Sequence, residues 1–119
     1  MIAARHAAAI FLLALVVRAA FVFWAPGVVS GDDLWHNARC ETLANGAGYI
    51  DVDGSPSIVW MPGWSLLLAG LYALFGAHLA LGFAANVVLG ALTALGVAVL
   101  VARLLSPGAG LVTGVLYAV

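Results

Sequence analysis

Hydrophobic residues along this chain form long runs, and one polar segment at residues 25–61 interrupts them. The first run, residues 7–24, would extend roughly 27 Å as a helix, which is close to the hydrocarbon thickness of a bilayer. Further apolar runs follow at residues 62–76, 79–102 and 109–119. The pattern predicts an all-α membrane protein in which transmembrane helices flank one polar loop.

Proline, glycine and serine residues mark the ends of the later runs. Pro62 suits the first turn of a helix and Gly76 suits a left-handed C-terminal cap. Only about 13 residues lie between them, roughly 20 Å, so this second span is short unless residues 58–61 also enter the apolar layer. Residues 106–108, Ser-Pro-Gly, predict a turn before a fourth span. Because we expect the chain end to truncate that span, the sequence predicts the N-terminal part of a polytopic helix bundle.

The first run has a second interpretation as a signal peptide, because the basic residue Arg5 precedes an apolar stretch. Arg18 interrupts that stretch, and no small-x-small cleavage site precedes the loop, so a retained span is favoured. Arg18 lies one to two turns from the end of the run, where its side chain can reach the interface beside Phe21, Phe23 and Trp24.

Composition agrees with a membrane location. Of the residues 66% are hydrophobic and 8% are charged, whereas roughly a quarter of an ordinary soluble domain is charged. The net charge of -1 offers no basic patch for nucleic acid, and the single Cys40 excludes an internal disulfide and a four-cysteine zinc site. Gly110 and Gly114 have GxxxG spacing, which serves helix packing within the chain or a dimerisation face.

The polar segment itself predicts a short helix over residues 31–45. Ser30 fits its N-cap, with Asp33 three residues on, and Asn45-Gly46 fits its C-terminal stop. The apolar side of this helix would contain Leu34, Trp35, Ala38 and Leu43, and its polar side Asp32, Asp33, His36, Asn37 and Arg39. We expect this amphipathic helix to lie at the membrane surface. Residues 49–60, with Asp53-Gly54 at the turn, predict a small hairpin or ordered loop.

The acidic residues are candidates for chemistry, and all five lie in the polar segment. Asp32 and Asp33 begin the predicted helix, where the helix dipole favours ionised carboxylates. Such a carboxylate can cap the helix, accept the proton of an attacking hydroxyl, or ligate a divalent cation. Glu41, Asp51 and Asp53 are expected to be solvated or turn residues.

Two further polar residues share this helix with the acids. His36 lies four residues beyond Asp32 and three beyond Asp33, so the three side chains can share one face. They could bind a metal ion, but a fourth ligand is lacking, and a surface histidine is the competing interpretation. Arg39 could contact a phosphate or pair with Asp32, Asp33 or Glu41.

The order of these motifs resembles the N-terminal part of polytopic glycosyltransferases of the C-type superfamily. The nearest likeness is to the family 39 group, related to dolichyl-phosphate-mannose protein mannosyltransferases and bacterial lipid A aminoarabinose transferases. The likeness rests on residues 31–36, 43–49 and 60–76, and it extends over roughly residues 10–105. Each motif is loose by itself, so the likeness depends on their order and spacing.

The resemblance implies a many-span enzyme that transfers a sugar from a polyprenyl-phosphate donor to a protein, lipid or glycan acceptor on the extracytoplasmic side. The segment 25–61 would then face outward from a bacterial inner or plasma membrane. Asp32 falls on the leading carboxylate of the family's acidic loop motif, which acts as a base or together with a divalent cation. Asp33 stands where the family often has Glu.

The family's frequent Arg-Pro-Pro before the second span is here Trp60-Met61-Pro62, which lacks the arginine. The resemblance therefore makes Arg18 and Arg39 candidates for contacting the lipid phosphate, and His36 a further candidate for substrate binding. The rival interpretation is a non-enzymatic membrane protein, such as a transporter subunit, whose loop is a structural connector. Transporters place ionisable residues within their spans, and these spans have almost none apart from Arg18, which favours the enzyme.

Overall fold

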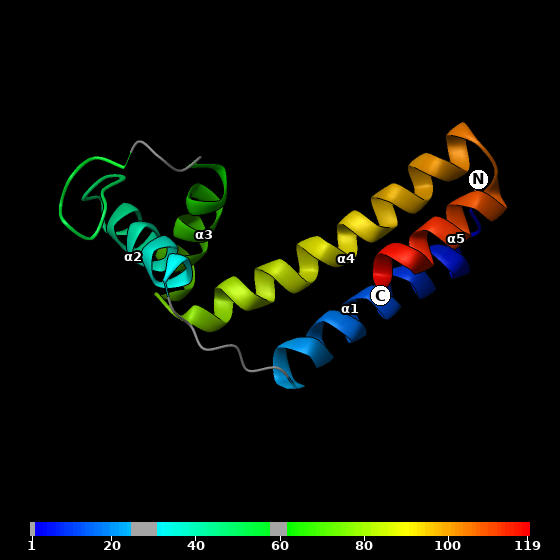
Figure 1. Ribbon diagram of the computed structural model, residues 1–119, viewed down its shortest axis with the longest axis horizontal. Coiled ribbons are helices and arrows are strands. Elements are labelled where there is room, and N and C mark those ends of the chain that lie inside the picture. The colour runs from blue at the N-terminus through cyan, green and yellow to red at the C-terminus, as the bar shows by residue number, and fades with distance from the viewer. Residues whose placement is uncertain (1, 25–30, 58–61) are drawn as a thin grey trace. The chain divides into compact units, whose positions relative to one another are not determined.

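The structure is a computed structural model that describes residues 2–24, 31–57 and 62–119, with the side chains of residues 32 and 33 left out. The described residues contain five α-helices (Figure 1): α1 (Ala4–Trp24), α2 (Asp32–Ala44), α3 (Pro62–Phe75), α4 (Leu79–Leu104) and α5 (Pro107–Ala118). Among them, α1 with 21 residues and α4 with 26 are long and apolar enough to cross a membrane. The predicted all-α architecture is confirmed, while the polytopic bundle stays a prediction.

The short helix α3 begins and ends where the sequence indicated, whereas α5 begins at Pro107, two residues earlier than predicted, so Pro107 and Gly108 belong to the helix and not to the expected turn. Pro62 is the first residue of α3, and the N–H of Gly76, which has φ 87°, donates to the carbonyl of Tyr72 just after the helix. Before α5, the Ser106 hydroxyl accepts a hydrogen bond from the N–H of Ala109 at 3.1 Å. At 14 residues, α3 extends only about 21 Å. The residues that could lengthen it, 58–61, lie outside the described part of the chain.

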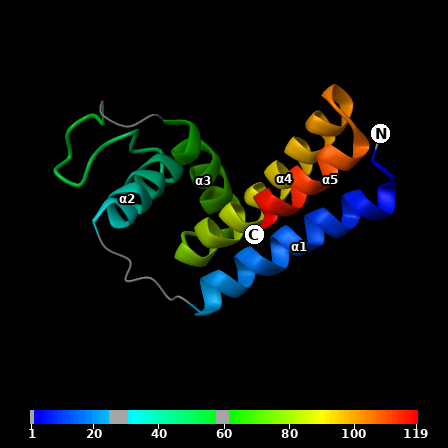
Figure 2. The same cartoon turned by 45° about the vertical axis from the view of Figure 1, so that its right-hand side comes forward.

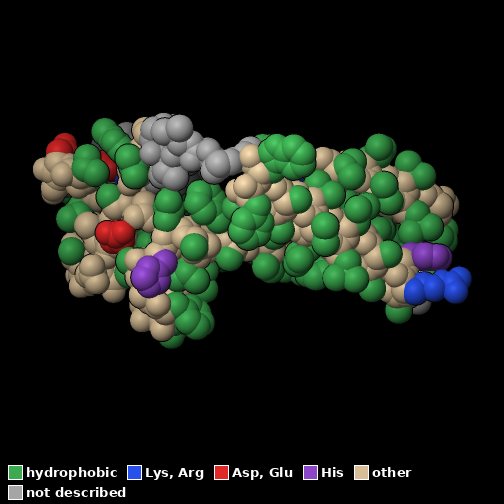
Figure 3. All heavy atoms as spheres, turned by 90° about the horizontal axis from the view of Figure 1, so that it is seen from below, with side chains coloured by type: hydrophobic (Ala, Val, Ile, Leu, Met, Phe, Trp, Pro, Cys, Tyr) green, Lys and Arg blue, Asp and Glu red, His purple; other side chains and the backbone are tan. Residues whose placement is uncertain are grey.

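The chain divides into two compact units, residues 1–26 with 84–119 and residues 27–83. In the first unit, α5 runs alongside α1 and α4 (Figures 1 and 2). The buried core is made of small and aliphatic side chains from all three helices: Ile10, Ala14, Ala91, Ala94, Ala98 and Ala118. Hydrophobic side chains are spread over the face drawn in Figure 3, and charged side chains are few there.

Glycines allow the close approach of α5 to its neighbours in the first unit. A Cβ atom on Gly110 would lie 2.5 Å from the carbonyl oxygen of Ala98. A Cβ atom on Gly114 would lie 2.7 Å from both the Cβ of Ala98 and the Cδ1 of Ile10. The GxxxG spacing therefore packs helices within this chain, as the first of its two interpretations predicted.

In the second unit, α2 packs against α3. Cys40 of α2 forms a buried cluster with Leu68 and Tyr72 of α3. On the predicted apolar side of α2, Leu34 and Trp35 are exposed, so a surface contact of this side with a membrane stays a prediction. Arg39, expected on the polar side, is instead fully buried together with Cys40. Burial follows the contact with α3 and the loop after α2, and hydropathy alone did not indicate which side that contact would use.

The sequence predicted the C-terminal end of α2 correctly but not the N-cap residue at its start. The N-cap position is Gly31, with φ 58° and no side-chain hydrogen bond, so the prediction of Ser30 as N-cap is wrong. At the other end the N–H of Gly46 donates to the carbonyl of Leu43, and the N–H of Ala47 to that of Thr42. This pair of bonds is a Schellman motif, and it confirms the predicted stop at Asn45-Gly46.

The loop that follows α2 is a tight turn with one antiparallel bridge, between Ile50 and Pro56. The N–H of Ser57 donates to the carbonyl of Tyr49 at 2.9 Å, and the N–H of Asp51 donates to that of Ser55 at 2.8 Å. These bonds confirm an ordered hairpin-like loop. The predicted return strand over residues 58–60 lies outside the described residues.

Candidate functional site

The candidate acidic site is the start of α2, where Asp32 and Asp33 are the first two helical residues. Backbone N–H groups in the first turn of a helix lack intrahelical acceptors, and the helix dipole makes this end electropositive. This backbone position agrees with the predicted helix start, at which ionised carboxylates were expected. Their side chains lie outside the described residues, so the catalytic, capping and metal-binding roles of Asp32 stay predictions.

The side chain of Arg39 is fully buried and forms an ion pair with Asp51 through its Nε atom. Its Cζ atom also lies 5.7 Å from the centroid of the Trp35 ring, a cation–π distance. The sequence had suggested Asp32, Asp33 or Glu41 as partners and had left Asp51 as a solvated or turn residue. Asp51 does lie in the turn, where its carbonyl accepts from the N–H of Gly54. The observed pair joins residues 12 positions apart across the end of α2, and no local signal indicates such a contact.

Residues that the sequence analysis missed connect α2 to α3. The hydroxyl of Tyr72 donates to Oδ1 of Asn37 at 2.5 Å, and Nδ2 of Asn37 donates to Oε1 of Glu41 at 2.6 Å. A tyrosine within an apolar run is also typical of an ordinary membrane helix, so its spacing alone would not identify this network. The hydrogen bonds fix the rotation of α2 about its own axis relative to α3.

A second polar contact lies in the interior between the loop and α3. The hydroxyls of Tyr49 and Ser65 are 3.4 Å apart, and Ser65 is fully buried. Ser65 also hydrogen bonds with the neighbouring Cys40, and burial raises the pKa of that thiol above its ordinary value. A neutral, buried thiol of this kind is a packing group and a poor nucleophile.

Asp53 occupies the turn that the sequence predicted for it. Its Oδ1 atom accepts hydrogen bonds from the hydroxyl of Ser55 at 2.7 Å and from the backbone N–H of Ser55 at 3.0 Å. These bonds stabilise the carboxylate, so the pKa of Asp53 lies below its ordinary value. His36, by contrast, is half-buried on α2, and its predicted role in substrate binding stays a prediction.

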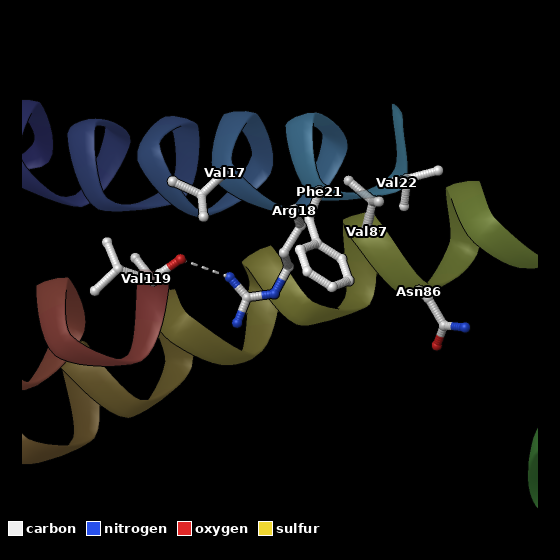
Figure 4. Close-up of a pocket in the computed structure, with 8 residues that line it drawn as sticks. Val17, Arg18, Phe21, Val22, Asn86, Val87 and Val119 are labelled. Carbon is white, nitrogen blue, oxygen red and sulfur yellow. Dashed lines mark hydrogen bonds between the residues drawn. The ribbon is translucent and has the colours of Figure 1, made fainter. Parts of the chain in front are cut away.

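Arg18 lies in the first unit, and its side chain reaches from α1 toward the last turn of α5 (Figure 4). One guanidinium nitrogen donates to the carbonyl of Ala118 at 3.0 Å, and the other to that of Tyr117 at 2.9 Å. Gly90 of α4 makes room for this arrangement, because a Cβ atom there would lie 2.5 Å from Nε of Arg18. Arg18 thus contacts backbone carbonyls of the protein. The sequence had suggested instead that its side chain reaches the membrane interface.

A cavity of about 400 Å³ adjoins Arg18 in the first unit (Figure 4). Its polar lining side chains are Arg18 and Asn86, and the rest are apolar. The residues around it are Val17, Arg18, Phe21, Val22, Asn86, Val87, Ala118 and Val119. An apolar cavity with one cationic side chain can accept a lipid chain that ends in an anionic group.

Among the side chains that the structure describes, no group of three or more His, Cys, Asp or Glu is positioned to hold a metal ion. Comparisons with protein-family models, with curated proteins and with solved structures found no match for this chain. Its function is therefore inferred from its own residues and from the motif order described above.

Proposed function

We propose that this chain is the N-terminal part of a multi-pass membrane glycosyltransferase that takes a sugar from a polyprenyl-phosphate donor. The acceptor is a protein, lipid or glycan on the extracytoplasmic side. The observation that carries the proposal is the pair of adjacent acids at the start of a helix, in the polar segment between the apolar helices α1 and α3. A lipid-linked donor arrives from the bilayer and a polar acceptor from water, and such a segment meets both.

The attachment of α2 supports this proposal because a catalytic base needs a fixed position. The ion pair between Arg39 and Asp51 and the hydrogen bond between Tyr72 and Asn37 connect α2 to the following loop and to α3. These contacts restrain the helix that begins with Asp32.

In the proposed reaction, a hydroxyl of the acceptor attacks the anomeric carbon of the donor sugar and Asp32 accepts the hydroxyl proton. The bond between that carbon and the phosphate oxygen breaks, and polyprenyl phosphate leaves with the bonding electrons. One displacement of this kind inverts the configuration at the anomeric carbon. Asp33 adds negative charge beside the base.

The donor lipid phosphate requires a cationic contact, and Arg18 is the candidate in the first unit. It adjoins the cavity of about 400 Å³ whose lining is mainly apolar. His36 remains a candidate for the sugar or acceptor. A divalent cation is the one cofactor of the proposal, with Asp32 as its candidate ligand, and the response of sugar transfer to EDTA tests whether it is needed.

The test uses the full-length protein in membranes, supplied with radiolabelled polyprenyl-phosphate hexoses and pentoses. Asp32→Asn keeps the size of the side chain and removes the base, so transfer is expected to fall by about 100-fold or more. Asp53→Asn is the matched control, because asparagine also forms the turn observed there. Unchanged transfer by Asp32→Asn, at equal protein levels, would remove Asp32 from the catalytic role.

A further inference from the structure

The polar segment carries three large hydrophobic side chains on its surface. Leu34 is 52% exposed, Trp35 is 47% exposed and Val52 is 59% exposed, whereas the charged Arg39 is only 1% exposed. This is the reverse of the usual distribution, in which large apolar side chains are buried and arginine faces water. Exposed apolar groups that gather on a polar element mark a surface that contacts another phase or partner.

The buried arginine links the two parts of this surface. The guanidinium of Arg39 lies against the ring of Trp35 on α2 and also pairs with Asp51, the residue before Val52 in the loop. One side chain therefore holds Trp35 and the loop segment with Val52 in place together. Trp35 and the segment with Val52 are therefore ordered before any binding, and no folding step has to precede it.

The connections of the chain indicate what the patch meets. Seven residues, 25–31, join the end of α1 to the start of α2, and they can extend at most about 25 Å. At the other end α3, which packs against α2, is separated from α4 by residues 76–78 alone. Because α1 and α4 are long and apolar enough to span a bilayer, the patch is held within reach of the membrane surface.

The chemistry of the patch fits the boundary between headgroups and acyl chains. Tryptophan is enriched at that depth because its ring is apolar and its N–H can still donate to water or headgroups. Residues 27–57 contain five acidic residues and one arginine, a formal net charge of -4. Anionic headgroups would repel that charge, so attachment must come from apolar insertion into a neutral surface.

We propose that Leu34, Trp35 and Val52 form a bilayer-docking patch that inserts into the interface of a zwitterionic membrane. The inference rests on the membrane location in the proposed function and not on the transfer reaction. By docking, the patch holds α2 at a constant depth against the membrane. Asp32 and Asp33 are part of the same helix and are held with it.

The experiment places the full-length protein in nanodiscs of phosphatidylcholine, with Trp24, Trp60 and Trp64 replaced by phenylalanine together with any tryptophan outside this sequence. Trp35 is then the one fluorescent reporter. Acyl chains brominated near the headgroup are expected to quench its emission, and aqueous iodide is expected to leave it unquenched. The matched control is Trp35→Phe with Ala47→Trp, which moves the reporter to an exposed residue outside the patch and should reverse both results.

Three further measurements make the proposal falsifiable. Leu34→Ser with Val52→Ser should shift Trp35 emission to the red and reduce quenching by bromine. Phosphatidylglycerol in the nanodisc should also reduce that quenching at low salt, and added salt should restore it. Asp32→Asn should leave the quenching of Trp35 by bromine unchanged, so failure of the transfer reaction is distinguishable from failure of docking.

Two outcomes would overturn the proposal. Quenching of Trp35 by iodide and not by bromine would show that the patch faces water. Protection of Trp35 from both quenchers would show that another part of the protein, or a partner, covers it.

Discussion

Replacing Asp51 by asparagine is the sharpest test of how the polar segment is held together. Asp51→Asn keeps the size and the hydrogen-bonding oxygen of the side chain but removes the negative charge beside a guanidinium that is only 1% exposed. Removing one partner of a buried ion pair destabilises proteins by about 3–5 kcal/mol. Because the side chain of Asp51 retains 16% exposure, the lower end of this range applies, and we expect a loss of about 3 kcal/mol.

Amide hydrogen exchange of the full-length protein in nanodiscs measures this loss locally. Exchange through opening of α2 should become about 150-fold faster in Asp51→Asn, since every 1.4 kcal/mol is a factor of ten. The amides of α4 within the first unit should exchange as in the unaltered protein. Asp53→Asn is the matched control, because it changes an exposed acid in the same loop and should leave α2 unaffected.

A double variant separates the charge effect from a general loss of packing. Arg39→Met with Asp51→Leu removes both charges and keeps most of the volume, which is often neutral for a buried pair. We expect the amides of α2 to exchange more slowly in this double variant than in Asp51→Asn alone. The reasoning would be refuted if Asp51→Asn left the exchange of α2 unchanged, or if the double variant were the less stable of the two.

Three other results are expected. Gly110→Ala should destabilise the packing of α5 by about 1–3 kcal/mol, because its Cβ would lie 2.5 Å from a backbone carbonyl of α4. A Cβ atom on Gly96 would have no neighbouring atom within 4 Å, so Gly96→Ala should be neutral or stabilising by about 0.5–1 kcal/mol. Thermal unfolding in detergent compares the two variants. The hydrogen bonds from Ser55 lower the pKa of Asp53 in the folded chain. The ionised carboxylate therefore stabilises the turn fully above about pH 4, and this stabilisation is lost as the pH falls through the pKa of the folded state. Amide exchange of residues 49–57 against pH should show the change, and Asp53→Asn should abolish it. Burial raises the pKa of Cys40, so at about pH 8 its thiol should resist alkylation in the folded chain and react after denaturation, as counted by mass spectrometry.

The candidate site shows where prediction from sequence ends. The short helix between the apolar runs followed from local signals, because the Asn45-Gly46 stop needs only a glycine that tolerates a left-handed conformation. The start of the same helix was predicted less well, since Gly31 takes the N-cap position that Ser30 was expected to fill. Pairing of Arg39 with Asp51 could not be foreseen, because it depends on how the loop folds back over the helix.

The sequence by itself determined which segments are helical and which of them are apolar enough for a membrane. Hydrophobic runs and the residues at their ends are local properties, and α1, α3 and α4 keep the bounds they predict to within a few residues. Tertiary structure alone decided which side of α2 is buried. The sequence placed Arg39 on the polar side of α2, yet its charge is buried because Asp51 and the Trp35 ring meet it there. Burial of a charged group depends on partners distant in sequence, and only the folded chain brings them together.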